Sequence, residues 1–293
     1  MSSCLREEID AETSKMGMGK KCLTNSDLEL NKRIIFIRHA ESKWNRAKKN
    51  NEKWKYKNEK KNDDPLLSSE GEKQAEALRE WIEESSHDIN QDESARILSG
   101  RLGSSSQVLS LVSNMLRAQR TAYIALRQRL EEVENEKLRI VSFLQEIPSF
   151  YPFGNFGPDL HPVAKEGKVP EGGNLLMENN YFDGRFNFGD INGKQDVDFR
   201  LKKFCKFLYM RSEQVVIAVG HSNWLKHFWK NFIPNDSASL NSLETKLKTE
   251  KIDNASVISF QLEIGPNGKC RIVPKSTNLV YGNLSSQSMK KND

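Results

Sequence analysis

The stretch RIIFIRHAESKWN, residues 33–45, places a short apolar run directly before a cluster of polar and charged side chains. Residues 34–37 are mostly branched and are bounded by charge, which is typical of a strand buried on both faces of a parallel sheet. Arg38 and His39 would then lie at the carboxyl end of that strand. Because ligands bind at this edge in open α/β sheets, the stretch predicts both a fold class and the place of a site.

The rest of the chain repeats this alternation of strands and helices. Further buried strands are predicted at 108–112, 138–144 and 215–219, with helices from about residues 70, 116 and 196 and after residue 222. Residues 257–262 alternate in polarity and predict an edge strand. The pattern favours a single three-layer α/β/α domain with a largely parallel sheet, in which one edge strand can be antiparallel.

The predicted catalytic domain covers residues 31–275, between a flexible N-terminal tail (1–30) and a disordered C-terminal tail (276–293). Residues 85–106 are polar and indicate a loop. Residues 148–195 are rich in Gly, Asn, Pro and Phe and lack periodicity. That is too long for an ordinary connection, so we expect a lid or cap over the site.

The positive charge is concentrated in one place. The 293-residue chain has a formal net charge of +5, yet residues 43–61 alone contribute +7. The protein is therefore near neutral with one basic insertion (residues 43–63). Trp44, Trp54 and Tyr56 among its lysines would suit single-stranded nucleic acid or an anionic membrane surface. A Lys/Asn-rich stretch is more often a solvated insertion, so we expect neither partner, although a cationic flap could steer anionic substrates.

The composition bears on the cellular location of the protein and on the state of its cysteines. No segment has the roughly 18 apolar residues that span a bilayer, and the N-terminus has no secretory pattern. The cysteines, Cys4, Cys22, Cys205 and Cys270, lie far apart without a CxxC pair, so neither a zinc site nor a disulfide framework is indicated. These features predict a cytoplasmic protein with reduced thiols.

The side chains that follow the predicted strands have one consistent chemistry. They are two arginines, two histidines and a glutamate: Arg38, His39, Arg117, Glu146 and His221. Guanidinium groups match phosphate oxygens, a neutral imidazole can attack phosphorus, and a carboxyl group can move a proton to or from an oxygen. This set needs no metal and no cofactor, because the arginines and a histidine supply the positive field.

The same residues carry a family resemblance. Residues 38–45, RHAESKWN, resemble the RHGExxWN signature of the histidine phosphatase superfamily, in its phosphoglycerate mutase-like branch. Residues 65–75 resemble its PLTxxGxxQA element and residues 113–122 its SxxxRAxxTA element. Leu144-Gln145-Glu146 and Gly220-His221-Ser222 resemble its LxE and GHS elements. One segment alone would be weak, but the set agrees in order and spacing.

The resemblance implies a role for each matching residue. His39 would be the nucleophile and Glu146 the proton donor, with His221, Arg38 and Arg117 forming the phosphate pocket. Asn45 would add a phosphate contact. Asp159 and Glu166, in the predicted lid, are the other donors considered. Ala40 stands where the family has Gly, and we expect that position to need only a small side chain and not a positive φ.

The residues after Glu146 bear on whether the reaction is hydrolysis or phosphate transfer within the substrate. The true phosphoglycerate mutases follow the glutamate with a basic-aromatic-glycine run and a paired arginine element. Here Ile147-Pro148-Ser149-Phe150 follows Glu146, and no basic pair lies between residues 147 and 195. We therefore expect metal-independent hydrolysis of a phosphate monoester, on a small phosphorylated substrate or a phosphoprotein. The alternatives are a bisphosphoglycerate-dependent mutase and a non-catalytic scaffold that binds an anionic partner through residues 43–61. The sequence does not determine the substrate or the oligomeric state.

Overall fold

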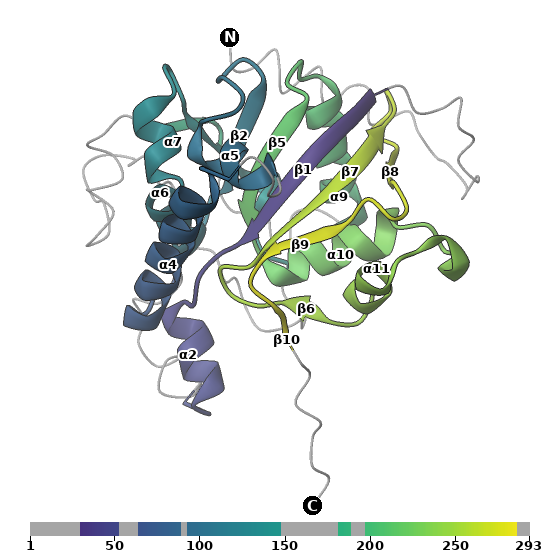
Figure 1. Cartoon of the computed structure of the whole chain (residues 1–293). Coiled ribbons are helices and arrows are strands. Elements are labelled where there is room, and N and C mark those ends of the chain that lie inside the picture. Colours follow the sequence, from purple (N-terminus) through teal and green to yellow (C-terminus); the bar gives the residue numbers. More distant parts are fainter. Residues whose placement is uncertain (1–29, 53–63, 89–92, 148–180, 189–196, 286–293) are drawn as a thin grey trace, which may run out of the picture.

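The computed structural model describes residues 30–52, 64–88, 93–147, 181–188 and 197–285. Its helices and strands alternate along the chain (Figure 1). The strands are β1 (Leu30–Arg38), β2 (Val108–Ser113), β3 (Leu138–Val141), β4 (Phe182–Phe186), β5 (Val215–Gly220), β6 (Lys251–Ile252), β7 (Val257–Ile264), β8 (Cys270–Ile272), β9 (Asn278–Tyr281) and β10 (Leu284–Ser285). The helices are α2 (Lys43–Lys49), α4 (Ser69–Ser85), α5 (Glu93–Ser99), α6 (Leu116–Ala125), α7 (Arg127–Glu132), α9 (Val197–Tyr209), α10 (Ser222–Phe232) and α11 (Ser242–Leu247).

The central sheet has a parallel half and an antiparallel half. Its strand order is β4-β3-β2-β5-β1-β7-β8, with β9 also paired to β7. All pairs from β4 to β1 are parallel, whereas β7 is antiparallel to β1, β8 and β9. The predicted largely parallel α/β fold is confirmed. The prediction that residues 257–262 form an edge strand was wrong, because β7 has partners on both sides.

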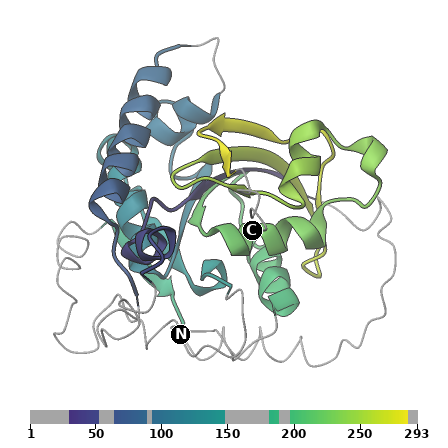
Figure 2. The ribbon, with the colours of Figure 1, turned by 90° about the horizontal axis from the view of Figure 1, so that it is seen from below.

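Helices cover both faces of this sheet, which explains why its central strands are apolar throughout. In β1, Ile34 and Phe36 pack into the core formed with α9 and α10, whereas Ile35 and Ile37 pack into the core formed with α4 and α6. Figure 2 shows the two groups of helices on opposite sides of the sheet. A strand buried on both faces has no polar positions to alternate, so a continuous apolar run marks it.

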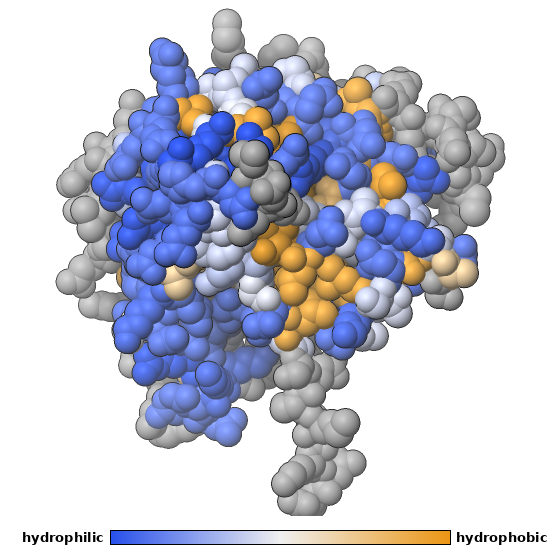
Figure 3. Space-filling view, viewed as in Figure 1, coloured by the Kyte–Doolittle hydropathy of each residue, from blue (hydrophilic) through white to orange (hydrophobic). Residues whose placement is uncertain are grey.

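Helix α4 shows how a capping residue and an apolar stripe in the sequence determine a helix. The Oγ of Ser68 caps it by accepting a hydrogen bond from the backbone N–H of Gly71 at 3.0 Å, as expected for a serine at this position. Ala75, Leu78 and Ile82 form its buried stripe. The side of the molecule that carries α4 and α2 is hydrophilic at the surface (Figure 3).

Several predicted loops and tails contain regular structure. Within residues 85–106, α5 is a short helix that buries Ala95, Ile97 and Leu98, so the loop prediction was wrong there. Residues 43–49 of the basic insertion form α2, and residues 182–186 of the predicted lid form β4, an edge strand parallel to β3. Residues 278–285, assigned to the C-terminal tail, form β9 and β10. The strands β4, β9 and β10 are short and depend on pairing with strands distant in sequence, so local sequence patterns did not predict them.

One cysteine pair also departs from the prediction of reduced thiols. Cys205 on α9 and Cys270 on β8 form a disulfide, with their Cα atoms 6.4 Å apart. Both side chains lie in the apolar core between α9 and the antiparallel half of the sheet. The two residues are 65 positions apart in sequence, and only the folded topology brings them together.

Within the described residues, no helix has both the length and the apolar character needed to cross a bilayer.

Candidate active site

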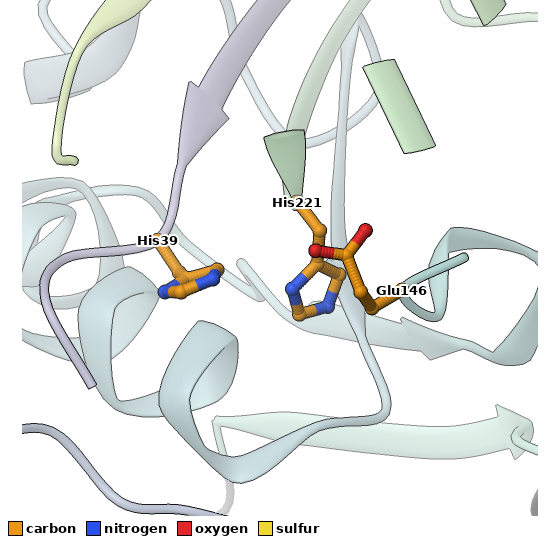
Figure 4. A group of neighbouring side chains, drawn as sticks. All are labelled: His39, Glu146 and His221. Atoms are coloured by element: carbon orange, nitrogen blue, oxygen red, sulfur yellow. The ribbon is translucent and has the colours of Figure 1, made fainter. Parts of the chain in front are cut away.

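Two neighbouring parallel strands end in the histidines predicted from the sequence. His39 follows β1 and His221 follows β5, and these strands pair in register up to Arg38 and Gly220. The imidazole rings approach edge to face with centroids 4.9 Å apart. Glu146, after β3, completes the group: side-chain nitrogen and oxygen atoms of all three residues lie within 4.8 Å of one another (Figure 4).

The hydrogen bonds of His39 define its tautomer. Its Nδ1 lies 2.7 Å from the carbonyl oxygen of Ala40. A carbonyl oxygen can only accept, so Nδ1 carries the ring proton and Nε2 has a lone pair. The Nε of Arg117 donates to this Nε2 at 3.2 Å. The ring is therefore fixed by its far nitrogen and presents an unprotonated Nε2 beside a guanidinium group.

Two arginines lie against the histidines. Arg117 is in the first turn of α6 and is buried, and its charge acts on both His39 and His221. Arg38 is anchored through Nη1 to the carbonyl oxygen of Ile252 at 2.5 Å, and its charge also acts on both rings. The site thus places two arginine cations beside a histidine ring whose Nε2 is unprotonated.

Burial sets the protonation of both rings. Desolvation is the largest cause that lowers the pKa of His39 well below 6.5, and Arg117 and Arg38 lower it further. Desolvation likewise lowers the pKa of His221 well below 6.5, followed by the charges of Arg117 and His39. Both imidazoles are therefore neutral around pH 7, which is the state that a nucleophilic nitrogen requires.

Ser113, at the end of β2, orients His221. Its Oγ lies 2.8 Å from Nε2 of His221 and accepts a hydrogen bond from the backbone N–H of Met115 at 3.3 Å. The hydroxyl can then donate its own proton to Nε2, which leaves the ring proton of His221 on Nδ1. That Nδ1 is buried and has no hydrogen-bond partner among the described residues. An N–H group in this position can donate to a bound anion.

The carboxylate of Glu146 is held by the start of helix α10. Its Oε1 accepts hydrogen bonds from the backbone N–H groups of Trp224 and Ile147, each at 3.1 Å. The side-chain amide of Asn223 donates to the carbonyl oxygen of Ile147 at 3.1 Å, and Arg200 donates to the carbonyl oxygen of Gln145. Backbone contacts on both sides of Glu146 therefore fix its position beside His221.

The contacts of the segment after His39 account for the glycine in residues 65–71, PLLSSEG. A Cβ atom on Gly71 would lie 1.9 Å from the carbonyl oxygen of Glu41, so only glycine fits there. The backbone N–H of Glu41 donates to Oε1 of Gln74 at 2.9 Å. Helix α4 thus supports the residues that follow His39. Ala40 is buried and is not among the described non-glycine residues with positive φ, which confirms that its position needs only a small side chain.

The structure brings together most of the predicted site residues but not all of them. His39, His221, Glu146, Arg38 and Arg117 converge. Asn45 instead completes the capping box of α2, where its Oδ1 accepts hydrogen bonds from the backbone N–H and Oγ of Ser42 at 3.2 and 3.0 Å. The two other donors considered, Asp159 and Glu166, lie outside the described residues, as does most of the predicted lid.

Two further residues at the site had no clear signal in the sequence. The side chain of Asp64 is buried beside Arg117, with Oδ1 3.5 Å from Nη1, and burial raises the pKa of Asp64 to about 6. Its position directly before Pro65 was the only available hint. Asn254 donates from Nδ2 to the backbone carbonyl of His39 at 2.9 Å. That contact joins residues 215 positions apart, so no local pattern could predict it.

The arrangement favours an anion over a cation. His39, Glu146 and His221 could supply ligand atoms to a metal ion. However, Arg38 and Arg117 place two permanent positive charges beside these atoms, and Nε2 of His39 already accepts a hydrogen bond from Arg117. A phosphate group matches the guanidinium donors of Arg38 and Arg117. The fold and this group of side chains form a candidate phosphate-binding site in which one histidine presents an unprotonated nitrogen.

Comparison with known families agrees with this description. Residues 34–145 match the model of the histidine phosphatase superfamily (branch 1). The matched range contains β1, β2 and β3 together with Arg38, His39 and Arg117. The resemblance inferred from the sequence motifs is thereby confirmed. Comparison with curated protein sequences found no significant match.

Solved structures with a similar fold include phosphatases and a mutase. A mycobacterial glucosyl-3-phosphoglycerate phosphatase is 15% identical, with 84% of this chain and 98% of that chain covered and a TM-score of 0.39. A phosphoserine phosphatase from Entamoeba histolytica is 15% identical, with 84% and 96% covered and a TM-score of 0.39. A phosphoglycerate mutase from Thermus thermophilus is 17% identical, with 78% and 92% covered and a TM-score of 0.35.

Proposed function

We propose that this protein hydrolyses phosphate monoesters through a covalent phosphohistidine on His39. The observation that carries the proposal is the state of that ring: Nδ1 donates to the carbonyl oxygen of Ala40, and Nε2 keeps its lone pair beside Arg117. A substrate phosphate seated between Arg38, Arg117 and His221 would present its phosphorus to this nitrogen. The guanidinium groups would stabilise the charge on the phosphate oxygens during transfer.

The reaction then has two steps. In the first, Nε2 of His39 attacks phosphorus, the bond from phosphorus to the ester oxygen breaks, and Glu146 gives a proton to the leaving oxygen. In the second, water attacks the phosphohistidine while Glu146 takes a proton from that water. The phosphorus–nitrogen bond breaks, inorganic phosphate leaves, and Nε2 regains its electron pair. Glu146 thereby regains the proton that it gave in the first step.

The test is an aryl phosphatase assay on the wild type and on His39→Ala. We expect at least about a 10³-fold loss of kcat/KM in this variant. His227→Ala is the matched control, because His227 lies on α10 and is only half buried. Circular dichroism of each variant checks folding. Equal activity of His39→Ala and wild type, with both folded, would exclude the proposal.

Two further measurements separate the alternatives. Rapid acid quench followed by intact-mass analysis should detect one phosphoryl group on the wild type and none on His39→Ala. A mutase assay primed with bisphosphoglycerate should give only slow turnover. Fast phosphoglycerate interconversion with slow hydrolysis would assign the protein to the mutases instead.

A further inference from the structure

A buried carboxyl group lies beside the candidate site and takes no part in the two proposed steps of the reaction. The side chain of Asp64 is 4% exposed, and its Oδ1 lies 3.5 Å from Nη1 of Arg117. The same guanidinium group donates from Nε to Nε2 of His39 at 3.2 Å. Arg117 therefore contacts the proposed nucleophile through one nitrogen and a carboxyl group through another.

The other carboxyl oxygen of Asp64 fixes the start of helix α6. Oδ2 accepts a hydrogen bond from the backbone N–H of Leu116, the first residue of that helix, at 2.7 Å. The N-cap residue, Met115, makes no side-chain capping hydrogen bond. The first N–H groups of a helix lack partners within the helix, so Asp64 supplies the acceptor that the cap residue does not. Because Arg117 follows Leu116, this contact also fixes the backbone from which the guanidinium group extends.

The chain around Asp64 is held against the segment that follows His39. The backbone N–H of Lys43 donates to the carbonyl oxygen of Leu66 at 2.9 Å. Pro65 lies between Asp64 and that contact, and a proline restricts its own backbone and that of the residue before it. The position of Asp64 is therefore fixed relative to the segment after His39 as well as to α6.

Oδ1 of Asp64 is a buried oxygen that lacks a hydrogen bond. It has no hydrogen-bond partner among the described residues, so its contact with Arg117 is an ion pair alone. Within the same residues, Arg117 is the one charged side chain that acts on Asp64. One long contact does not compensate for burying a charged oxygen, and burial accordingly raises the pKa of Asp64 to about 6. The carboxyl group can therefore change its charge close to neutral pH.

An anion bound by Arg117 would respond to this charge. An ionised Asp64 competes with the anion for the same guanidinium group and repels it. Protonation of Oδ1 removes both effects, while Oδ2 still accepts the hydrogen bond from Leu116. The proton therefore favours the anion, and by reciprocity the bound anion favours the proton by the same factor.

We propose that Asp64 is a positioning residue for Arg117 that must take up a proton before the phosphate site binds a dianion at full strength. The proton comes from solvent and binds Oδ1, and no bond to the substrate forms or breaks at Asp64. This proposal rests on the proposed phosphatase function and adds control of its phosphate site by pH. Asp64 acts through Arg117 and is not a catalytic residue.

Calorimetric binding of sulfate to the wild type and to Asp64→Asn tests this proposal. Sulfate has the tetrahedral shape of phosphate and keeps two negative charges across the pH range used, so its own titration does not contribute. The wild type should bind sulfate about 10-fold more weakly at about pH 8 than at about pH 5, because affinity is lost as the pH rises through 6 and Asp64 ionises. Asp64→Asn should change less than about 3-fold, since the amide keeps an acceptor for Leu116 but has no charge.

Glu72→Gln is the matched control, because Glu72 pairs with Arg120 on the same helix α6 at 3.1 Å and is part-exposed. It should keep the pH dependence of the wild type. Equal pH dependence of sulfate binding in the wild type and Asp64→Asn would overturn the proposal, and so would a wild type that binds no sulfate at pH 5. Neither result concerns hydrolysis, which the aryl phosphate assay on His39→Ala tests separately.

Steady-state kinetics on the aryl phosphate separate the position of Asp64 from its charge. At about pH 8, Asp64→Asn should lower KM about 10-fold and change kcat less than about 3-fold, since the lost repulsion acts on bound substrate and transition state alike. Asp64→Ala also removes the acceptor for Leu116 and should lower kcat about 5-fold or more. Circular dichroism checks the folding of each variant at each pH. If Asp64→Ala has the same kcat as Asp64→Asn, Asp64 does not position Arg117 and the proposal is wrong.

Discussion

The parallel half of the sheet and its antiparallel half contribute differently to the candidate site. Strands β1, β2, β3 and β5 are parallel, so their carboxyl ends meet at one edge, and the residues at and after these ends supply both histidines, Glu146, Arg38 and Arg117. The antiparallel strands β7, β8 and β9 bring no such group together. Supporting contacts come from just before β7 instead: Ile252 in β6 accepts a hydrogen bond from Arg38, and Asn254, between β6 and β7, donates one to the backbone of His39.

This difference follows from strand direction. Parallel strands put all their carboxyl ends on one side, where side chains from distant parts of the sequence converge. Antiparallel neighbours end on opposite sides, so they cannot build the same cluster. The parallel half therefore holds the proposed reacting groups, whereas β6 and the segment that leads into the antiparallel half hold residues that contact Arg38 and His39. Substitutions in the first should abolish activity, and those in the second should reduce it.

The largest expected effect is at Arg117, in the parallel half. Arg117→Ala removes a buried guanidinium that donates to Nε2 of His39. We expect kcat/KM for an aryl phosphate to fall about 10²- to 10³-fold, because a fixed donor to the developing charge is lost. Arg120→Ala is the matched control on the same helix, since Arg120 pairs with Glu72 at 3.1 Å and is part-exposed. Comparable losses in both variants would contradict the assignment of Arg117.

The next effect is on stability and comes from Asp64. Its pKa is about 6 in the folded protein and 3.8 as an ordinary side chain. The folded state therefore binds this proton more tightly, and the resulting stability is full below pH 3.8 and lost as the pH rises through 6. Relative to Asp64→Asn, the wild type should lose up to about 3 kcal/mol of unfolding free energy between pH 4 and pH 7.

Urea unfolding of both proteins across this range measures the difference. The gap between wild type and Asp64→Asn should be flat above about pH 7. A wild-type advantage that grows with rising pH would show instead that pairing with Arg117 outweighs the burial of Asp64, and it would reverse the direction of the shift.

The smallest effect tests the antiparallel half. Asn254→Ala removes the hydrogen bond to the backbone carbonyl of His39. We expect kcat to fall about 5- to 10-fold, with unfolding free energy lower by about 1 kcal/mol. Asn278→Ala on exposed β9 is the control and should change neither value. A loss as large as that of Arg117→Ala would remove the distinction between reacting and supporting halves.

Most of the fold could be predicted because its signals are local. The apolar run before Arg38 and the capped stripe of α4 each lie within one short stretch and formed the expected elements. The elements that were missed, α5, β4 and β9, are short, and tertiary partners stabilise them. An antiparallel strand was allowed for, but it was placed at the edge of the sheet, because alternation of polarity does not identify the partner strands.

The candidate site also has features that the sequence predicted and features that depend on tertiary contacts. The sequence by itself determined the residue types and their order along the chain, because the motifs containing His39, Arg117, Glu146 and His221 are contiguous. Only the tertiary structure decided which nitrogen of His39 has the lone pair, since that depends on contacts from Ala40 and Arg117. It likewise decided that Asp64 and Asn254 adjoin the site and that Asn45 completes the capping box of α2. These are contacts between distant segments, and their geometry is fixed only when the two cores pack on the sheet.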